Sequence, residues 1–366
     1  MSRNINSGIP HVLDVRNVDE AFFRGAELLR EQGVQRPSRD GMTLECPFPV
    51  ITSYANPWEC VLGYDQQRKP NPFFHFFEAL WMLAGRRDVE MLKHYNSQMA
   101  AYSDDGEVFH AAYGYRLRHH FGIDQINHCI AKLKKNANDR QVVMQIWDCN
   151  SDLDKVSKDI PCNDFVMFRV DDPACGRRLN MTVCCRSNDM IWGCYGSNVV
   201  QFAFLHKYIA TMAGFRMGRY NQLSHSFHVY TERPQWEAIK GISFENYLND
   251  TYYTGGFCNI PKEAATPSQL MMTYPDDWYN DLLTFLDDPQ CCDVRNYWFH
   301  KTARPMWLAY ECHKQRNYDI ALTHAGTIEA DDWRLACTTW LRRVREAYED
   351  REARKLREEK EAQATS

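Results

Sequence analysis

The chain has 366 residues, of which 44% are hydrophobic and 25% are charged, and its formal net charge at pH 7 is −5. This is the composition of a globular protein with a sizeable core, and it gives no general electrostatic reason to bind nucleic acid. The first twenty residues contain no apolar signal-peptide core, and no apolar run reaches the length of about 18 residues that a membrane span needs. We therefore expect a cytoplasmic protein without a membrane anchor.

Periodicity predicts a series of helices and strands along the chain. A helix is predicted over residues 18–32, and Gly and Pro break the pattern in 33–42. A very apolar helix follows over 73–85, and a long one over 198–215. Runs rich in β-branched and aromatic residues predict strands, which are residues 141–147, 164–170, 179–185 and 220–230. The polar or Gly- and Pro-containing segments between the first three favour a mostly antiparallel sheet.

The 14 cysteines form no even framework, and the zinc spacing C-x-x-C is absent. Many lie inside apolar stretches, so the pattern indicates a reducing compartment, no metal site and mostly buried, inert thiols. Cys162 differs because it follows Pro161 directly at the start of a predicted strand. Arg186, at the end of a neighbouring strand, could stabilise a Cys162 thiolate and also hold a phosphate. Each signal is weak alone, since a Pro-Cys pair arises by chance and the segment 186–189 could be a simple turn.

Glu78 lies in the middle of the apolar helix FFHFFEALWML. A carboxylate on a buried helix face costs several kcal/mol unless it is paired or neutralised. Either Glu78 occupies one exposed stripe or it is buried for a functional reason, and the nearly all-apolar helix favours the second interpretation.

Taken in order, these segments resemble thymidylate synthase and its relatives, the pyrimidine-nucleotide hydroxymethylases, over roughly residues 20–235. The resemblance implies a large mixed, mostly antiparallel α/β (α+β) sheet fold with a long central helix in residues 1–235. Residues 236–366 are then a family-atypical, mainly helical extension that ends in a charged tail. The segments that carry the resemblance are QRPSRDGM with Arg39, FEALWMLAG with Glu78, AAYG with Tyr113, DRQVVMQIWD with Arg140, IPC with Cys162, CRSND with Arg186, Ser187 and Asp189, GSN with Asn198, and HVY with His228 and Tyr230.

The resemblance implies a role for each of these residues. Cys162 is expected to attack C6 of a pyrimidine nucleotide, Glu78 to organise proton transfers and water, and Tyr113 to assist proton removal at C5. The substrate-binding residues follow: Arg39, Arg186 and Ser187 for the phosphate with Arg140 from a second subunit, Asp189 for base or folate, Asn198 for the base edge, and His228 and Tyr230 for the sugar hydroxyl. Simpler roles stay open for Ser187 and Asp189 as turn residues, and for His228, Tyr113 and Tyr230 as core residues.

The implied partners are dUMP, 5,10-methylenetetrahydrofolate as the one-carbon donor, and a second copy of the chain in a homodimer with shared sites. Asn198 favours dUMP, because an asparagine amide matches uracil N3–H and O4, whereas dCMP-specific relatives use an aspartate. An amide can flip to suit either base, so its neighbours decide.

Several positions depart from the family pattern. Asn163 replaces a histidine, Gln141 an arginine and Ser226 an aspartate, and one extra residue lies between Gly193 and Asn198. The tryptophan that packs on the folate in synthases is missing, since its position falls on Met99 or Ala100, and the short closing tail has no counterpart. Both losses favour capture of the one-carbon unit by water, hence 5-hydroxymethyl-dUMP, as in phage-type members. Thymidylate synthesis, dCMP hydroxymethylation and an inactive nucleotide-binding relative remain the alternatives.

Overall fold

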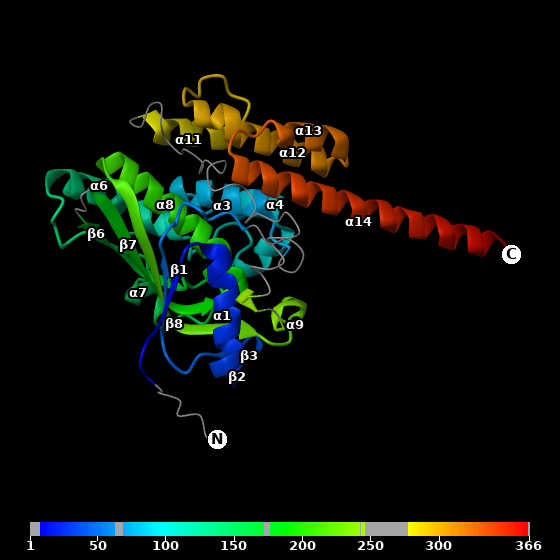
Figure 1. Cartoon of the computed structure of the whole chain (residues 1–366). Helices are drawn as coiled ribbons and strands as arrows, with labels where there is room; N and C mark the ends of the chain where they lie inside the picture. Colours follow the sequence, from blue (N-terminus) through cyan, green and yellow to red (C-terminus); the bar gives the residue numbers. More distant parts are fainter. Residues whose placement is uncertain (1–7, 63–68, 172–175, 242, 246–276, 365–366) are drawn as a thin grey trace.

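One mixed sheet organises the first two thirds of the chain in the computed structural model, which describes residues 8–62, 69–171, 176–241, 243–245 and 277–364 (Figure 1). The strand order is β1-β4-β8-β7-β6-β5, and the hairpin β2–β3 joins β8 through β3. β1–β4 and β7–β8 are parallel, and the other described pairings are antiparallel. The strands are β1 His11–Val15, β2 Val34–Ser38, β3 Gly41–Glu45, β4 Val50–Tyr54, β5 Val143–Gln145, β6 Asn163–Asp171, β7 Arg178–Asp189 and β8 Arg216–Tyr230.

The pairing of β6, β7 and β8 brings the candidate residues to one edge of the sheet. β7 and β8 run parallel, with Asp189 opposite His228, so both strands end at the same edge. β6 runs antiparallel to β7 and begins at Asn163, opposite Cys185. Cys162, the residue before β6, therefore lies beside the ends of β7 and β8.

The helices include both long apolar segments predicted from the sequence. α3 and α8 contact each other along the sheet (Figure 1). The predicted break at 33–42 is instead the β2–β3 hairpin, and the short strands β1 and β4 were not predicted. The helices are α1 Val18–Gln32, α3 Pro72–Leu83, α4 Val89–Tyr95, α5 Tyr113–Tyr115, α6 Gln125–Lys135, α7 Cys149–Asp152, α8 Asn198–Ala213, α9 Pro234–Ile239, α11 Trp278–Asp287, α12 Arg304–Lys314, α13 Tyr318–Gly326 and α14 Asp331–Ala364. Short helical segments of other types are the 3₁₀ helix η1 Ser97–Tyr102 and the π-helices η2 Arg116–His120, η3 Met190–Ser197 and η6 Phe299–Ala303.

α3 has a clear start and is buried along its length. The Asn71 side chain accepts a hydrogen bond from the first turn, Pro72 occupies the first turn, and every residue from Pro72 to Leu83 is buried. The segment of Tyr113 packs directly on this helix, because a Cβ on Gly114 would lie only 1.9 Å from the Met82 carbonyl oxygen. Glycine at 114 is therefore what brings Tyr113 close to α3.

The C-terminal helices share the core of the sheet region. The Phe76 ring of α3 stacks on Trp298 at 5.5 Å and meets the edge of Trp333 at 5.0 Å. α14 continues past this contact and projects into solvent as a charged helix (Figure 1). Residues 246–276 of the predicted extension lie outside the described residues. Within the described ranges, no helix combines the length and the hydropathy that crossing a lipid bilayer requires.

Candidate active site

Arg186 holds the segment that ends in Cys162. The backbone N–H of Arg186 donates to the Cys162 carbonyl oxygen at 2.9 Å, and its side-chain Nε donates to the Pro161 carbonyl oxygen at 2.9 Å. The guanidinium also lies over the Trp147 ring, 5.4 Å from its centroid. Burial raises the pKa of the half-buried Cys162 thiol, and the positive charge of Arg186 opposes that rise. Thiolate formation at Cys162 therefore depends on this arginine.

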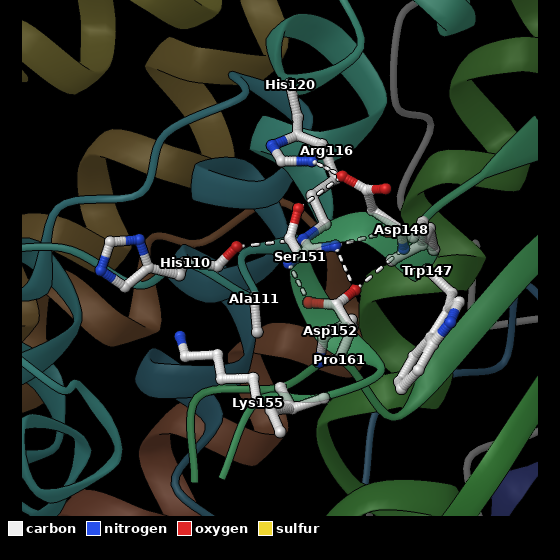
Figure 2. Close-up of polar contacts among 12 residues, drawn as sticks. His110, Ala111, Arg116, His120, Trp147, Asp148, Ser151, Asp152, Lys155 and Pro161 are labelled. Atoms are coloured by element: carbon white, nitrogen blue, oxygen red, sulfur yellow. Dashed lines mark hydrogen bonds and ion pairs between the residues drawn. The ribbon is translucent and has the colours of Figure 1, made fainter. Parts of the chain in front are cut away.

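A buried ion pair fixes the loop that leads to Cys162 (Figure 2). Arg116 donates to both carboxylate oxygens of Asp152, at 2.6 and 2.7 Å, and its Nη1 also donates to the Ile146 carbonyl oxygen at 3.0 Å. Next to it, His120 Nε2 lies 2.8 Å from Asp148 Oδ2. Removing one partner of such a buried pair typically costs about 3–5 kcal/mol, so this cluster anchors the loop.

Asp159 connects the Cys162 loop to the segment of Tyr113. Its carboxylate accepts from the backbone N–H groups of His110 and Ala111, at 2.7 and 2.8 Å. Asp159 lies three residues before Cys162, and Ala111 lies two residues before Tyr113. These hydrogen bonds therefore hold the backbone near both site residues together.

Tyr113 lies against Cys162. Burial raises the pKa of its phenol, and the thiols of Cys162 and Cys185 add to the effect, whereas the Asn163 amide and the backbone N–H of Cys162 favour the ionised form. Neither side-chain oxygen nor nitrogen of Asn163 makes a hydrogen bond of ordinary geometry within the described ranges. Asn163 is itself 0% exposed, so its amide lies inside the protein beside Tyr113.

Glu78 is buried, with 5% of its surface exposed, which rules out the exposed-stripe interpretation. Burial raises the pKa of its carboxyl to about 8, and hydrogen bonds from Ser197 and Gln201 oppose that rise. Its Oε2 has no hydrogen-bond partner among the described residues. A carboxyl that is protonated near neutral pH and has a free oxygen is suited to passing a proton to a bound substrate.

The predicted phosphate residues divide into two groups. Arg39, in the β2–β3 turn, donates to the Ser157 carbonyl oxygen at 2.7 Å, and its charge, like that of Arg186, opposes the rise that burial causes in the pKa of Cys162. Ser187 lies in β7 directly after Arg186, so these residues share the Cys162 edge. Arg140 is exposed and precedes β5, where Val143 pairs with Met167. Because β5 and β6 are antiparallel, Arg140 lies toward the far end of β6, away from the Cys162 of its own chain.

Asp189, His228 and Tyr230 meet at the ends of β7 and β8. Asp189 Oδ1 accepts from the backbone N–H groups of Ile191 and Trp192, at 2.7 and 3.2 Å, so it caps η3 as the simpler interpretation expects. His228 is buried with its Nδ1 3.2 Å from the Ser226 hydroxyl. Burial raises the pKa of Tyr230, and the charge of Asp189 adds to it. The three side chains are thus brought together, while their contacts with substrate stay predictions.

Asn198 is the first residue of α8 and is buried, and its Nδ2 donates to Asn188 Oδ1 at 3.2 Å. The preceding turn, η3, is a π-type helix with non-helical dihedral angles at Tyr195 and Gly196. A π-type turn accommodates one more residue than an α-turn, which accounts for the extra residue before Asn198.

Sequence reasoning missed Asn188 and Gln201, and it did not connect Ser197 with Glu78. Ser197 directly precedes α8 and Gln201 lies in its first turn, and this four-residue spacing was the available signal that both could reach Glu78. Among the residues described, no group of three or more His, Cys, Asp or Glu could hold a metal ion.

Comparison with known proteins agrees with this arrangement. A family model described as thymidylate synthase matches residues 67–241. The chain is 41% identical over 351 residues to the deoxyuridylate hydroxymethyltransferase of Pseudomonas phage M6, covering 94% of this chain and 97% of that protein. The chain belongs to the thymidylate synthase family. The family and the fold predicted from the motifs are therefore confirmed.

Other family members match shorter stretches. The deoxyuridylate hydroxymethyltransferase of Bacillus phage SP01 is 36% identical over 195 residues, half of each chain. A putative thymidylate synthase of Methanothermobacter marburgensis is 36% identical over 141 residues, 38% of this chain and 59% of that protein. The phage M6 alignment, because it covers 94% of this chain, also includes most of the C-terminal helices.

Proposed function

We propose that this protein transfers a one-carbon unit from 5,10-methylenetetrahydrofolate to C5 of dUMP and that water completes the reaction, giving 5-hydroxymethyl-dUMP and tetrahydrofolate. The observation that carries the proposal is the junction of Cys162, Tyr113 and Arg186 at one sheet edge, in a chain similar over 94% of its length to a phage enzyme named for this reaction. Such a product would supply modified thymidine for viral DNA made in the host cytoplasm.

The chemistry follows from the residue types. The Cys162 thiolate adds to C6 of uracil, which makes C5 enolate-like, and C5 attacks the methylene carbon of the folate. The C5 proton then leaves toward a base assisted by Tyr113, and elimination releases tetrahydrofolate and an exocyclic methylene. Water adds to that methylene, with Glu78 handling its proton, and the Cys162 thiolate is expelled from C6. One dUMP, one methylenetetrahydrofolate and one water are consumed, and one 5-hydroxymethyl-dUMP and one tetrahydrofolate are formed. The reaction consumes no external oxidant or reductant.

Binding roles follow the placement of the remaining residues. Arg39, Arg186 and Ser187 would bind the phosphate, since the arginine fork pairs two phosphate oxygens at once. The other assignments are Asn198 for the base edge, Asp189 for base or folate, and His228 and Tyr230 for the sugar hydroxyl.

The side chains near the expected folate position favour water over hydride as the reactant that completes the reaction. Met99 and Ala100 lie half-buried in η1 and pack against the core, where synthases are expected to place a tryptophan. Without a stacking ring at this position, the folate should leave before it can deliver hydride.

A homodimer is proposed from one uncovered face of the sheet. Val143 of β5 and Met167 of β6 pair across the strands and are 50% and 37% exposed, and Phe165 beside them is 38% exposed. An apolar, solvent-facing strand pair is expected to bind another surface. A second copy covering it would bring Arg140 toward a partner's phosphate site, which the position of Arg140 in its own chain does not allow.

The test is product analysis with dUMP and methylenetetrahydrofolate. Release of tritium from 5-tritiated dUMP and a 5-hydroxymethyl product by mass analysis are expected, without the near-ultraviolet absorbance rise that dihydrofolate formation causes. Cys162→Ala is the control and should release no tritium. A main product of dTMP would make the protein a thymidylate synthase, and no release at all would make it an inactive binder.

A further inference from the structure

Buried polar side chains lead from Asn198 into the sheet, and the proposed reaction does not use them. Asn198 Nδ2 donates to Asn188 Oδ1 at 3.2 Å, and Asn188 Nδ2 donates to Ser224 Oγ at 2.9 Å. Asn188 is 1% exposed and Ser224 is 0% exposed, so bulk water does not compete for these bonds. We call Asn198, Asn188 and Ser224 the amide row.

The amide row has a fixed direction because of what lies beyond Ser224. Ser224 Oγ is 3.7 Å from Cys194 Sγ, and that thiol donates to Gln222 Oε1 at 3.4 Å. The Tyr54 hydroxyl also donates to Gln222 Oε1, at 3.5 Å. A carbonyl oxygen only accepts, so the single hydrogen of the Cys194 thiol is used on Gln222. Ser224 then accepts from Asn188 and turns its own hydrogen toward Cys194 Sγ, so the hydrogens of the row point away from Asn198.

This direction decides which groups Asn198 can offer to a base. One Nδ2 hydrogen is used by Asn188, which leaves the other hydrogen and Oδ1. Those groups complement uracil, whose O4 accepts and whose N3–H donates. Cytosine needs the reverse order, and a flipped Asn198 would set its Oδ1 against the Asn188 Oδ1, two acceptors with no hydrogen between them.

Local packing leaves the Asn198–Asn188 pair little room to separate. A Cβ on Gly193 would lie 3.0 Å from Asn188 Oδ1 and 3.3 Å from Asn198 Nδ2, so the η3 backbone closes over both amides. If Asn188 also flipped, its oxygen would need a hydrogen from Ser224, whose hydroxyl would have to turn away from Cys194. Reading cytosine thus requires several buried groups to reverse together.

We infer that Asn188 and Ser224 are positioning residues that lock the Asn198 amide for uracil and thereby reject cytosine. The inference deepens the proposed function, on which it rests only for placing the base edge at Asn198. It concerns nucleotide choice and not whether the product carries a methyl or a hydroxymethyl group.

The experiment measures dissociation constants for dUMP and dCMP in a Cys162→Ser background, which keeps turnover out of the readout. The parent is expected to prefer dUMP. Asn188→Leu and Ser224→Ala should each reduce the dUMP-to-dCMP preference by about tenfold or more, because one wrongly paired buried group costs that much. The double variant should match Asn188→Leu alone, since Ser224 acts through Asn188.

Ser53→Ala is the matched control. Its hydroxyl is also buried and donates to an asparagine of β8, Asn221, at 2.7 Å, but it does not touch the amide row. Ser53→Ala should lower the free energy of unfolding and leave the dUMP-to-dCMP preference unchanged. A parent without preference, or variants that weaken both nucleotides equally, would overturn the inference. A clear preference that Asn188→Leu abolishes in a protein making dTMP would retain the inference and reject only the hydroxymethyl product.

Discussion

Arg186 binds the backbone before Cys162 and does not bind the thiol itself, with its Nε donating to the Pro161 carbonyl oxygen at 2.9 Å. One side chain thus fixes the position of the nucleophile and supplies the charge that opposes the pKa rise caused by burial. The same guanidinium is the proposed phosphate ligand. Position, charge and binding are therefore coupled at Arg186, and conservative substitutions can separate them.

Arg186→Gln and Arg186→Lys should differ in their effect on the apparent pKa of the Cys162 thiol. The glutamine removes the charge, so the apparent pKa of Cys162, followed by its alkylation rate against pH, should rise. Lysine keeps the charge but loses the planar fork, so that pKa should change less, while kcat/KM for dUMP should fall about 10- to 100-fold. Arg169→Gln, at an exposed site on β6, is the control. Equal alkylation profiles in all variants would show that Arg186 does not influence the thiol.

Cys162→Ser should bind dUMP nearly as well as the parent and lose turnover, because a hydroxyl is a far weaker nucleophile than a thiolate at neutral pH. Other thiols are poor substitutes, since burial raises the pKa of Cys46 and of Cys129 to about 12. Equilibrium binding and tritium release measure the two properties separately. More than a trace of activity would mean that another cysteine is the nucleophile.

Glu78→Gln should change how stability depends on pH. The folded protein holds the Glu78 proton up to about pH 8, whereas an unfolded chain releases it near 4.5. Between these values the folded state binds more protons, so the free energy of unfolding falls as pH rises. The variant should lose this part of the fall and be relatively more stable at pH 8, as measured by urea unfolding between pH 5 and 9.

Asp332 provides a comparison for that measurement. Burial raises its pKa to about 7 from 3.8, so Asp332→Asn should remove a similar fall in a lower pH window. It lies in α14 on the C-terminal side of the protein and is not a proposed site residue. Its loss should therefore change stability without abolishing turnover, while Glu78→Gln should affect both. Identical pH profiles for parent and Glu78→Gln would show that the carboxyl is not held protonated.

The sequence predicted the elements whose pattern is strong and local. α3, α8, β6 and β7 carry long apolar or alternating runs, and the motifs placed Cys162 at the correct strand start. β1 (HVLDV) and β4 (VITSY) contain strand-forming residues, but each has only five residues, and their pairing partners are far apart in the sequence, so these short runs were overlooked. Asn188 was missed because its role comes from register between β7 and β8, which a single sequence does not display.

Mixed dimers should reveal whether Arg140 acts across an interface. A Cys162→Ala chain and an Arg140→Ala chain are each expected to be nearly inactive alone. In a mixed dimer one of the two shared sites has both residues intact, so mixing after mild unfolding should restore up to about half of the parent activity per mixed dimer. Mass analysis of the intact complex should confirm that mixed dimers form. Mixed dimers without activity would reject the shared site.

Restoring a tryptophan near the folate should shift the product. Met99 and Ala100 are half-buried in η1, and an indole there is expected to hold the folate against the nucleotide long enough for hydride transfer. Met99→Trp or Ala100→Trp should therefore give a minor share of dTMP, with matching dihydrofolate, beside 5-hydroxymethyl-dUMP. Tyr102→Trp, at a more exposed position of the same turn, is the control and should give none. If neither substitution yields dTMP while both proteins still bind folate, the missing ring is not what sends the intermediate to water.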